Sequence, residues 1–351
     1  MNYKVLIFTL FLSNAIGNLY WVKYGWELFD YVSEAKTAAL GQATSAYKYL
    51  SVSSSLSNPS FCLDEIKHIS ITHQSRFAGI VNSDLISLQL KKGKRLINVN
   101  LVYEGIGNIP DTRSALFDWG LDGEYGTNDQ GENNGIIDPG ERLDQNQIYY
   151  FSQKRIGIYG ASIYRFNNFP IGIGIKILSN TLGDYYGLGI GLDLGINKNI
   201  KNTSFGLVLR NMPSSGLLWD NGNVEGTLPA IEMGVQHSFT FLNVNSLVIN
   251  PMANLNLSMY NRHLDTQYYL GNLSFDMSFG IEGIYKEKIM LRLGQDSYKK
   301  LTGGIGLDWG KIILDYAFIP SSISGILANH HLISISFTID WILSKIIENR
   351  Y

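Results

Sequence analysis

The chain has 351 residues, of which 45% are hydrophobic and only 17% are charged, whereas about 25% of the residues of soluble proteins are charged. The formal net charge of −2 gives no reason to expect a nucleic-acid partner. Beyond the N-terminus no run of about eighteen apolar residues occurs, which argues against membrane-spanning helices. The 36 glycines, 21 tyrosines and 16 phenylalanines favour strands and turns.

The first seventeen residues have the parts of a secretory signal peptide. Met1–Lys4 is short and positively charged, Val5–Leu12 is apolar, and the small residues Ala15 and Gly17 follow. This order predicts cleavage after Gly17. The alternative is an uncleaved helical anchor, but the apolar run is too short for one and no stop-transfer flank follows. The single cysteine, Cys62, excludes an internal disulfide, and we expect it to be a packing residue.

Residues 18–64 do not alternate in hydrophobicity. They contain the alanine-rich stretch Ser33–Thr44 and the dipeptide Asn58–Pro59, which is followed by Ser60. An alanine-rich stretch that ends in small residues, and then an Asn-Pro pair, indicates a short helix and an ordered turn.

From about residue 65 the dominant period is two, which is typical of strands with one apolar face. Between Tyr186 and Ile196, large apolar side chains alternate with glycines and Asp193, and segments 230–239, 273–282 and 333–339 repeat the pattern. These runs are longer than most soluble strands. Strands of about ten residues, tilted by about 45°, cross a hydrocarbon core.

Fourteen such segments can be assigned, and the lengths of their connections depend on their order. The long connections, at 105–152, 212–227, 259–271 and 319–330, all follow odd-numbered strands, and every connection after an even-numbered strand is short. Short periplasmic turns that alternate with longer external loops are typical of bacterial barrels. The sequence therefore predicts an all-β fold, a transmembrane antiparallel β-barrel of about 14 strands over residues 65–341, with an extracellular loop at 105–152. A soluble β-sandwich is the alternative, but its usual size is far smaller.

The loop at 105–152 contains the segment richest in potential ligands. Residues 130–141 fit the spacing of an EF-hand-type calcium loop at most positions, with Gly135 at the sharp turn. Gln130 stands where aspartate is expected, and a solvated acidic loop is the alternative. We hypothesise that calcium orders this loop over the barrel mouth. The candidate ligands are Gln130, Glu132, Asn134, Ile136, Asp138 and Glu141.

Two further segments lie at the predicted periplasmic end. The basic cluster Lys91–Arg95 fits contact with anionic phospholipid or a periplasmic partner, or a solvated hairpin. The C-terminal tail, residues 342–351, either extends the last strand or forms a short helix. No Ser-His-Asp order, carboxylate dyad, phosphate loop or zinc spacing stands out, so we do not expect an enzyme.

Several short motifs follow one another in a recognisable order. Residues 39–43 read ALGQA, and Asn58, Pro59 and Ser60 fit an "NPA" turn in which Ser60 replaces alanine. These motifs resemble those of FadL-like outer-membrane proteins, and more closely those of the PorV/PorQ family, which is associated with type IX secretion. In the segment 329–334, His330 and Leu332 replace the family's threonine and arginine. The other matching segments are 206–212, 228–229, 291–294 and 314–318.

The resemblance implies that residues 18–64 form a plug inside the barrel and that the protein lies in the bacterial outer membrane, in contact with its lipid. It also implies a role in the export or surface delivery of secreted proteins, by binding and without catalysis, with a secretion translocon and secreted cargo proteins as partners. The alternative is a FadL-type channel for the uptake of hydrophobic small molecules. The predicted lumen face consists mainly of Gly, Ser, Asn, Asp and Glu, which favours export because it offers little apolar lining.

Overall fold

The fold is seen in a computed structural model, which describes residues 19–22, 26–62, 65–66, 68–167, 169–241, 246–259, 266–320, 329–341 and 344. The predicted signal peptide, residues 1–17, lies outside the described residues, as does all of the 342–351 tail except Ser344. Within the described part of the chain, no helix is long and apolar enough to cross a membrane.

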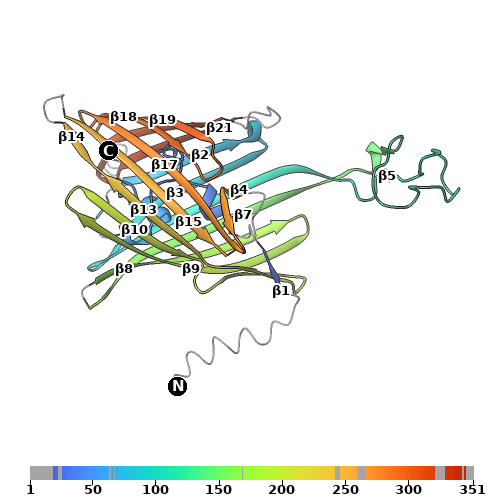
Figure 1. Cartoon of the computed structure of the whole chain (residues 1–351), viewed down its shortest axis with the longest axis horizontal. Helices are drawn as coiled ribbons and strands as arrows, with labels where there is room; N and C mark the ends of the chain where they lie inside the picture. Colours follow the sequence, from blue (N-terminus) through green and yellow to red (C-terminus); the bar gives the residue numbers. More distant parts are fainter. Residues whose placement is uncertain are drawn as a thin grey trace, which may run out of the picture.

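Fourteen antiparallel strands form a closed barrel, as the sequence predicts (Figure 1). The first wall strand, β2, pairs with β3 on one side and with the last strand, β21, on the other. Every wall strand thus has two partners, which satisfies its backbone groups without water. The wall strands are β2 (His68–Arg76), β3 (Val81–Lys92), β4 (Arg95–Asp111), β7 (Tyr149–Phe166), β8 (Phe169–Leu182), β9 (Tyr185–Ile200), β10 (Thr203–Arg210), β13 (Ala230–His237), β15 (Leu247–Ser258), β17 (Leu273–Tyr285), β18 (Ile289–Gln295), β19 (Leu301–Asp308), β20 (Ile312–Ile319) and β21 (His330–Thr338).

Shorter elements lie inside the barrel, at its ends, and in the long connection between β4 and β7. The N-terminal segment contributes a strand and four short helical turns, and the remaining elements belong to the connections between wall strands. They are β1 (Leu19–Trp21), α2 (Leu28–Tyr31), α3 (Ala35–Ala39), α4 (Ser54–Ser57), η1 (Pro59–Phe61), η2 (Phe77–Gly79), β5 (Leu116–Phe117), β6 (Arg142–Leu143), η3 (Gln145–Gln147), β11 (Ser215–Trp219), β12 (Val224–Thr227), β14 (Phe239–Phe241) and β16 (Tyr268–Leu270).

The alternation of side chains gives the barrel an apolar outside and a polar inside. On β9, Ile190 points outward and is 61% exposed, whereas Asp193 points inward and is 1% exposed. On β17, Phe279 and Ile281 are exposed, whereas Glu282 is buried. In the four segments for which the sequence predicts the outward face, 186–196, 230–239, 273–282 and 333–339, the structure has the same phase. A band of exposed aliphatic and aromatic side chains around a closed barrel is the surface that lipid covers in membrane barrels.

Strands β4 and β7 continue beyond the barrel as a projecting arm (Figure 1). The sequence predicts that the loop begins at residue 105, but the two strands remain paired as far as Asp111 and Tyr149. The register shifts between Ile106 and Ile109, where Asn108 has a positive φ of 53°. This irregularity interrupts the alternation, so the period alone ends the strand too early.

Candidate functional site

The N-terminal segment fills the lumen from one end of the barrel to the other. At the outer end, where the long connections lie, β1 pairs in parallel with β12. Helices α2, α3, α4 and η1 then lie inside the wall, and the chain enters β2 at the inner end, where the short turns lie. We call residues 26–62 the plug, a structure that the sequence predicts only through the family resemblance.

The turn at Asn58, Pro59 and Ser60 is bound both to an earlier part of the plug, at Ser45, and to the wall, at Ile196. The Asn58 side-chain oxygen accepts hydrogen bonds from the backbone N–H of Ser60 at 3.0 Å and from its hydroxyl at 2.7 Å. The Asn58 amide donates to the carbonyl of Ser45 at 2.8 Å and to that of Ile196 on β9 at 3.1 Å. Asn58 is fully buried, so each of these groups depends on a protein partner.

Replacement of Asn58 by alanine is expected to lower the stability of the folded protein by about 1–3 kcal/mol, because buried carbonyls then lose their donor. Asn58→Asp, the matched variant, keeps the acceptor for Ser60 but not the donor, so we expect it to be destabilised as well. The midpoint of urea unfolding in detergent measures both. Equal midpoints for the wild type and both variants would contradict this function of the amide.

Glycines on the lumen face allow the plug backbone to approach the wall closely. A Cβ at Gly172 would lie 2.1 Å from the nitrogen of Ser60, and one at Gly206 would lie 2.1 Å from the carbonyl oxygen of Ser45. Real Cβ atoms do not approach backbone so closely, so only glycine fits at these positions. The sequence shows many small residues on the lumen face; the structure shows that several of them lie against the plug.

A network of charged side chains links the wall strands to the plug. Lys176 pairs with Asp193 at 2.8 Å, and Arg210 pairs with Asp193 at 3.2 Å and with Glu232 at 2.9 Å. Arg210 also donates to the carbonyls of Leu56 and Ser57, at 2.7 Å each, at the end of α4. A second cluster joins Arg292 to Glu282 and Asp315. These buried charges are all paired, as their burial requires.

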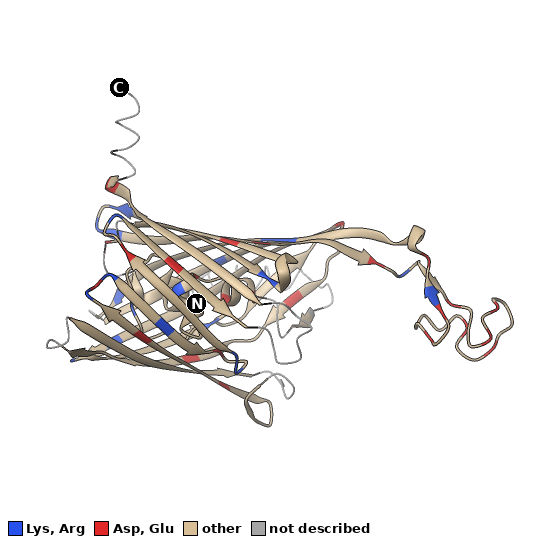
Figure 2. Ribbon diagram, turned by 90° about the horizontal axis from the view of Figure 1, so that it is seen from above, with Lys and Arg blue, Asp and Glu red and all other residues tan. Residues whose placement is uncertain are grey.

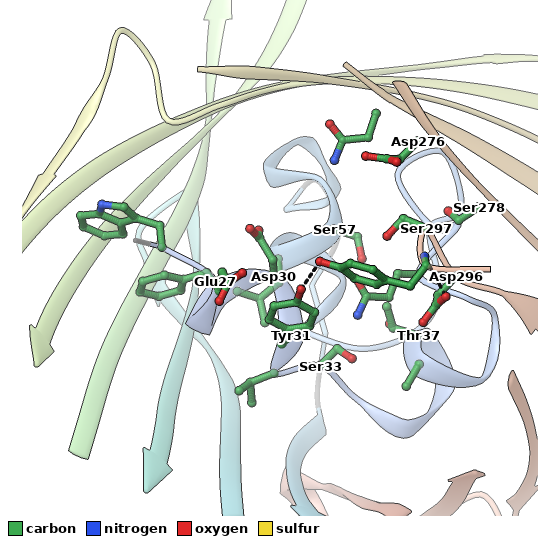
Figure 3. Close-up of a pocket in the computed structure, with 18 of the residues that line it drawn as sticks. Glu27, Asp30, Tyr31, Ser33, Thr37, Ser57, Asp276, Ser278, Asp296 and Ser297 are labelled. Carbon is green, nitrogen blue, oxygen red and sulfur yellow. Dashed lines mark hydrogen bonds between the residues drawn. The ribbon is translucent and has the colours of Figure 1, made fainter. Parts of the chain in front are cut away.

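Between the outer side of the plug and the wall lies a cavity of about 620 Å³, which we call the vestibule (Figure 3). Tyr31 of the plug stacks on Tyr298 of the β18–β19 turn at 6.2 Å, and their hydroxyls share a hydrogen bond. Trp26 and Phe29 stack at 5.9 Å and also line the cavity. Asp30 is exposed to it. The vestibule thus has aromatic surfaces beside polar and charged groups.

Charged side chains cover the wall of the vestibule. Arg76 and Arg155 both pair with Glu104, and the Arg76 guanidinium lies 5.9 Å from the ring of Tyr31. Burial raises the pKa of Tyr31 well above its usual value, and Tyr298 adds to this, so the phenol stays neutral. Although Asp30 borders the cavity, desolvation inside the barrel raises the pKa of its carboxyl, against the opposing charges of Lys176 and Arg210. These wall residues belong to no sequence motif; the signal that could identify them is an ionisable residue on the inward phase of a strand.

The candidate calcium ligands lie on the arm and are not part of the vestibule. Glu132 accepts hydrogen bonds from the backbone N–H groups of Gly126 and Asn128, and Glu141 accepts from those of Gly120 and Asp138. Among the described residues, no group of three His, Cys, Asp or Glu side chains is placed to hold a metal ion. In this arrangement the carboxylates of Glu132 and Glu141 accept hydrogen bonds from backbone groups of their own loop.

The remaining positions of the candidate calcium loop also bind within the arm. The carbonyl of Gln130 accepts from the N–H of Leu121 at 3.2 Å. The side chain of Asn134 accepts from the N–H of Ile136 at 2.6 Å and donates to Asp138 at 2.7 Å.

The single cysteine, Cys62, lies in the plug, where burial raises the pKa of its thiol to about 12. Such a thiol stays protonated and packs as an apolar side chain.

The architecture of the chain is similar to that of known outer-membrane barrels. The toluene transporter TodX of Pseudomonas putida matches 92% of this chain with 100% of its own, at 11% identity and a TM-score of 0.52. The fold is FadL-like. The monoaromatic hydrocarbon channel CymD (11% identity, 86% of this chain and 98% of CymD, TM-score 0.46) and a Pseudomonas aeruginosa FadL homologue (9%, 88% and 98%, 0.44) are more distant. No family model matches the sequence, and the comparison with curated proteins finds no relative.

Proposed function

We propose that this FadL-like protein is an outer-membrane channel that takes up hydrophobic small molecules and acts by binding, without catalysis. The observation that carries the proposal is the aromatic-lined vestibule of about 620 Å³ directly above a plug that fills the barrel. Cavities of roughly 300–1,000 Å³ suit small-molecule ligands. The similarity in fold to a toluene transporter also supports uptake. The sequence motifs, by contrast, favour export.

Outer-membrane location after removal of residues 1–17 belongs to the same proposal. The exposed apolar band of the closed barrel supports the membrane location, and the order of residues at the N-terminus supports cleavage. N-terminal sequencing of the protein from purified outer membranes tests both, with Asn18 expected as the first residue. Recovery in the soluble fraction would contradict the location, and an intact Met1 would contradict the cleavage.

Toluene is expected to bind the purified protein in detergent, and a charge placed in the vestibule is expected to weaken this binding. Ile319 lines the vestibule at the outer end of β20, so Ile319→Asp introduces a carboxylate that the ligand would have to desolvate. We expect the Kd, measured by calorimetric titration, to rise at least about tenfold, which corresponds to ~1.4 kcal/mol.

The matched control is Ile137→Asp, the same change at a residue of the arm that is 58% exposed. Its Kd for toluene should equal that of the wild type. Uptake of radiolabelled toluene by cells should follow the same order, with the deletion strain the slowest. Unchanged toluene binding by Ile319→Asp, or binding that falls equally in both variants, would rule out the vestibule as the binding site.

A second candidate function is export of the PorV/PorQ type, in which the protein binds a secretion translocon and cargo proteins. The arm favours it, because it carries exposed apolar side chains, such as Tyr125 and Ile136, well away from the barrel. Removing residues 112–148 separates the two functions. Export predicts that secreted proteins then accumulate in the periplasm, whereas uptake through the vestibule predicts an unchanged set of secreted proteins.

We also propose, from the spacing of residues 130–141 alone, that the arm binds calcium at millimolar concentration. Calorimetric titration with calcium should then give a binding heat that Glu141→Gln reduces, because a final glutamate supplies two oxygens in loops of this type. Glu124→Gln, a change at an exposed residue outside 130–141, is the control. Absence of any heat with the wild type would refute calcium binding.

A further inference from the structure

Basic residues gather at the turns of the inner end of the barrel, whereas the arm that projects from the outer end carries mostly acidic residues (Figure 2). We define the inner rim as the turns 91–95, 165–169, 197–203, 285–289 and 308–312, which join wall strands at the inner end. These turns contain ten lysines and arginines but only two carboxylates, Glu287 and Asp308. At the outer end, residues 112–148 of the arm contain eight carboxylates and two arginines. The ten basic residues of the inner rim are Lys91, Lys92, Lys94, Arg95, Arg165, Lys198, Lys201, Lys286, Lys288 and Lys311.

The basic side chains of the inner rim are accessible to an external partner. All ten basic side chains are exposed. Within the part of the chain that the structure describes, only Lys91 forms an ion pair, with Glu65 at 2.6 Å. Lys92, Lys94 and Arg95 share one tight turn without an opposite charge. Like charges this close repel one another, which favours the binding of an anion from outside.

Exposed aromatic side chains lie beside these charges. Phe166 and Phe169 pair across the β7–β8 turn and flank it, next to Arg165. Trp309 is 62% exposed and lies two residues from Lys311. Aromatic side chains at the edge of an apolar band mark the level of the lipid headgroups in membrane barrels. The basic side chains are therefore at or just beyond headgroup level.

We propose that the inner rim binds anionic phospholipids through their headgroups. The inference rests on the membrane location proposed above. Lysine and arginine beside a membrane attract anionic headgroups, while the neighbouring aromatic rings contact the acyl region. The charges are distributed over five turns around the barrel and are continuous with the apolar band, an arrangement that fits a ring of lipids better than one docked protein.

Lipid binding gives a function to the Lys91–Arg95 cluster, for which the sequence leaves three interpretations open: a lipid contact, a contact with a protein partner, and a solvated hairpin. It also gives the barrel two chemically different ends. The inner end holds anionic phospholipid, and the acidic arm faces away from it. A barrel whose two ends differ in charge in this way is expected to insert with its basic inner end at the leaflet that is rich in anionic lipid.

The test is native mass spectrometry of the full chain, released from detergent in the presence of phosphatidylglycerol or phosphatidylcholine. We expect phosphatidylglycerol to be retained at a Kd at least about tenfold lower than that of phosphatidylcholine, and high salt to reduce the difference. In the variant Lys92→Glu/Lys94→Glu/Arg95→Glu the preference should fall at least about fivefold. Glycerol phosphate at the same concentration should not displace the lipid, which distinguishes a lipid site from a site for free phosphate.

The matched control is Arg113→Glu/Lys154→Glu/Lys299→Glu, which makes the same change in net charge with three exposed residues towards the outer end. It should keep the wild-type preference. Equal affinity for the two lipids, or an equal loss in both triple variants, would overturn the inference, as would retention of a periplasmic protein in place of lipid. Failure to insert into phosphatidylcholine vesicles would instead contradict the membrane location itself.

Discussion

A leucine at position 172 is expected to turn the plugged barrel into an open pore. Gly172 lies against the plug turn, where even a Cβ would be 2.1 Å from the nitrogen of Ser60 and 2.2 Å from the carbonyl carbon of Pro59. Both contacts are with backbone, so the turn must move away from the wall. Because an unfilled barrel of this size leaves a water channel, we expect single-channel conductance in planar bilayers to rise at least about tenfold.

The control for this prediction is Gly283→Leu. Gly283 also lies on a wall strand but belongs to the outward phase of β17, and nothing lies within 4 Å of its Cβ position. Its conductance should equal that of the wild type. Migration of unheated samples on gels reports whether both barrels are folded. A folded Gly172→Leu barrel with wild-type conductance would show that the plug can shift without opening a path.

The loss of Arg210 is expected to destabilise the protein more than the loss of any exposed charge. Arg210→Met leaves Asp193 and Glu232 with one cation fewer and takes away the donor to two plug carbonyls. Breaking a buried ion pair by removing one partner costs roughly 3–5 kcal/mol. The midpoint of thermal unfolding in detergent should therefore fall by several degrees, and proteolysis of the plug should become faster.

Two further variants test whether the loss of stability of Arg210→Met arises from its buried ion pairs and hydrogen bonds. Arg210→Lys keeps the charge but loses the fork that binds two carbonyls and two carboxylates together, so we expect an intermediate loss. Arg113→Met removes an ion pair with Asp111 whose arginine is 89% exposed, and we expect no measurable change. Equal midpoints for Arg210→Met and Arg113→Met would show that the lumen network does not hold the plug.

The wall of the barrel could be predicted from the sequence because its physical cause is local. Each strand has lipid on one side and the lumen on the other, so its side chains alternate in polarity, and the phase at Ile190 and Asp193 follows directly. The alternation does not predict the extension of β4 and β7, because the irregularity near Asn108 interrupts it.

The site was less accessible to sequence reasoning because it is assembled from distant parts of the chain. The plug meets the wall through contacts such as Asn58 with Ile196 and Arg210 with Leu56, which leave no periodic signal. Residues 39–43 and 58–60 indicated a plug only through resemblance. In the sequence the polar lumen face argues against an apolar ligand, but several of its residues pack on the plug. The aromatic surface of the vestibule comes from the plug and from two turns of the wall.

The path of the plug constrains the order of assembly. Strand β1, which precedes the plug in the chain, pairs with β12 at the outer mouth, and the end of the plug leads into β2 at the inner one. A finished cylinder could admit such a segment only if the free end were threaded along the whole lumen. Assembly avoids this step if the strands of the wall form around the N-terminal segment and the pairing of β2 with β21, which closes the barrel, takes place last.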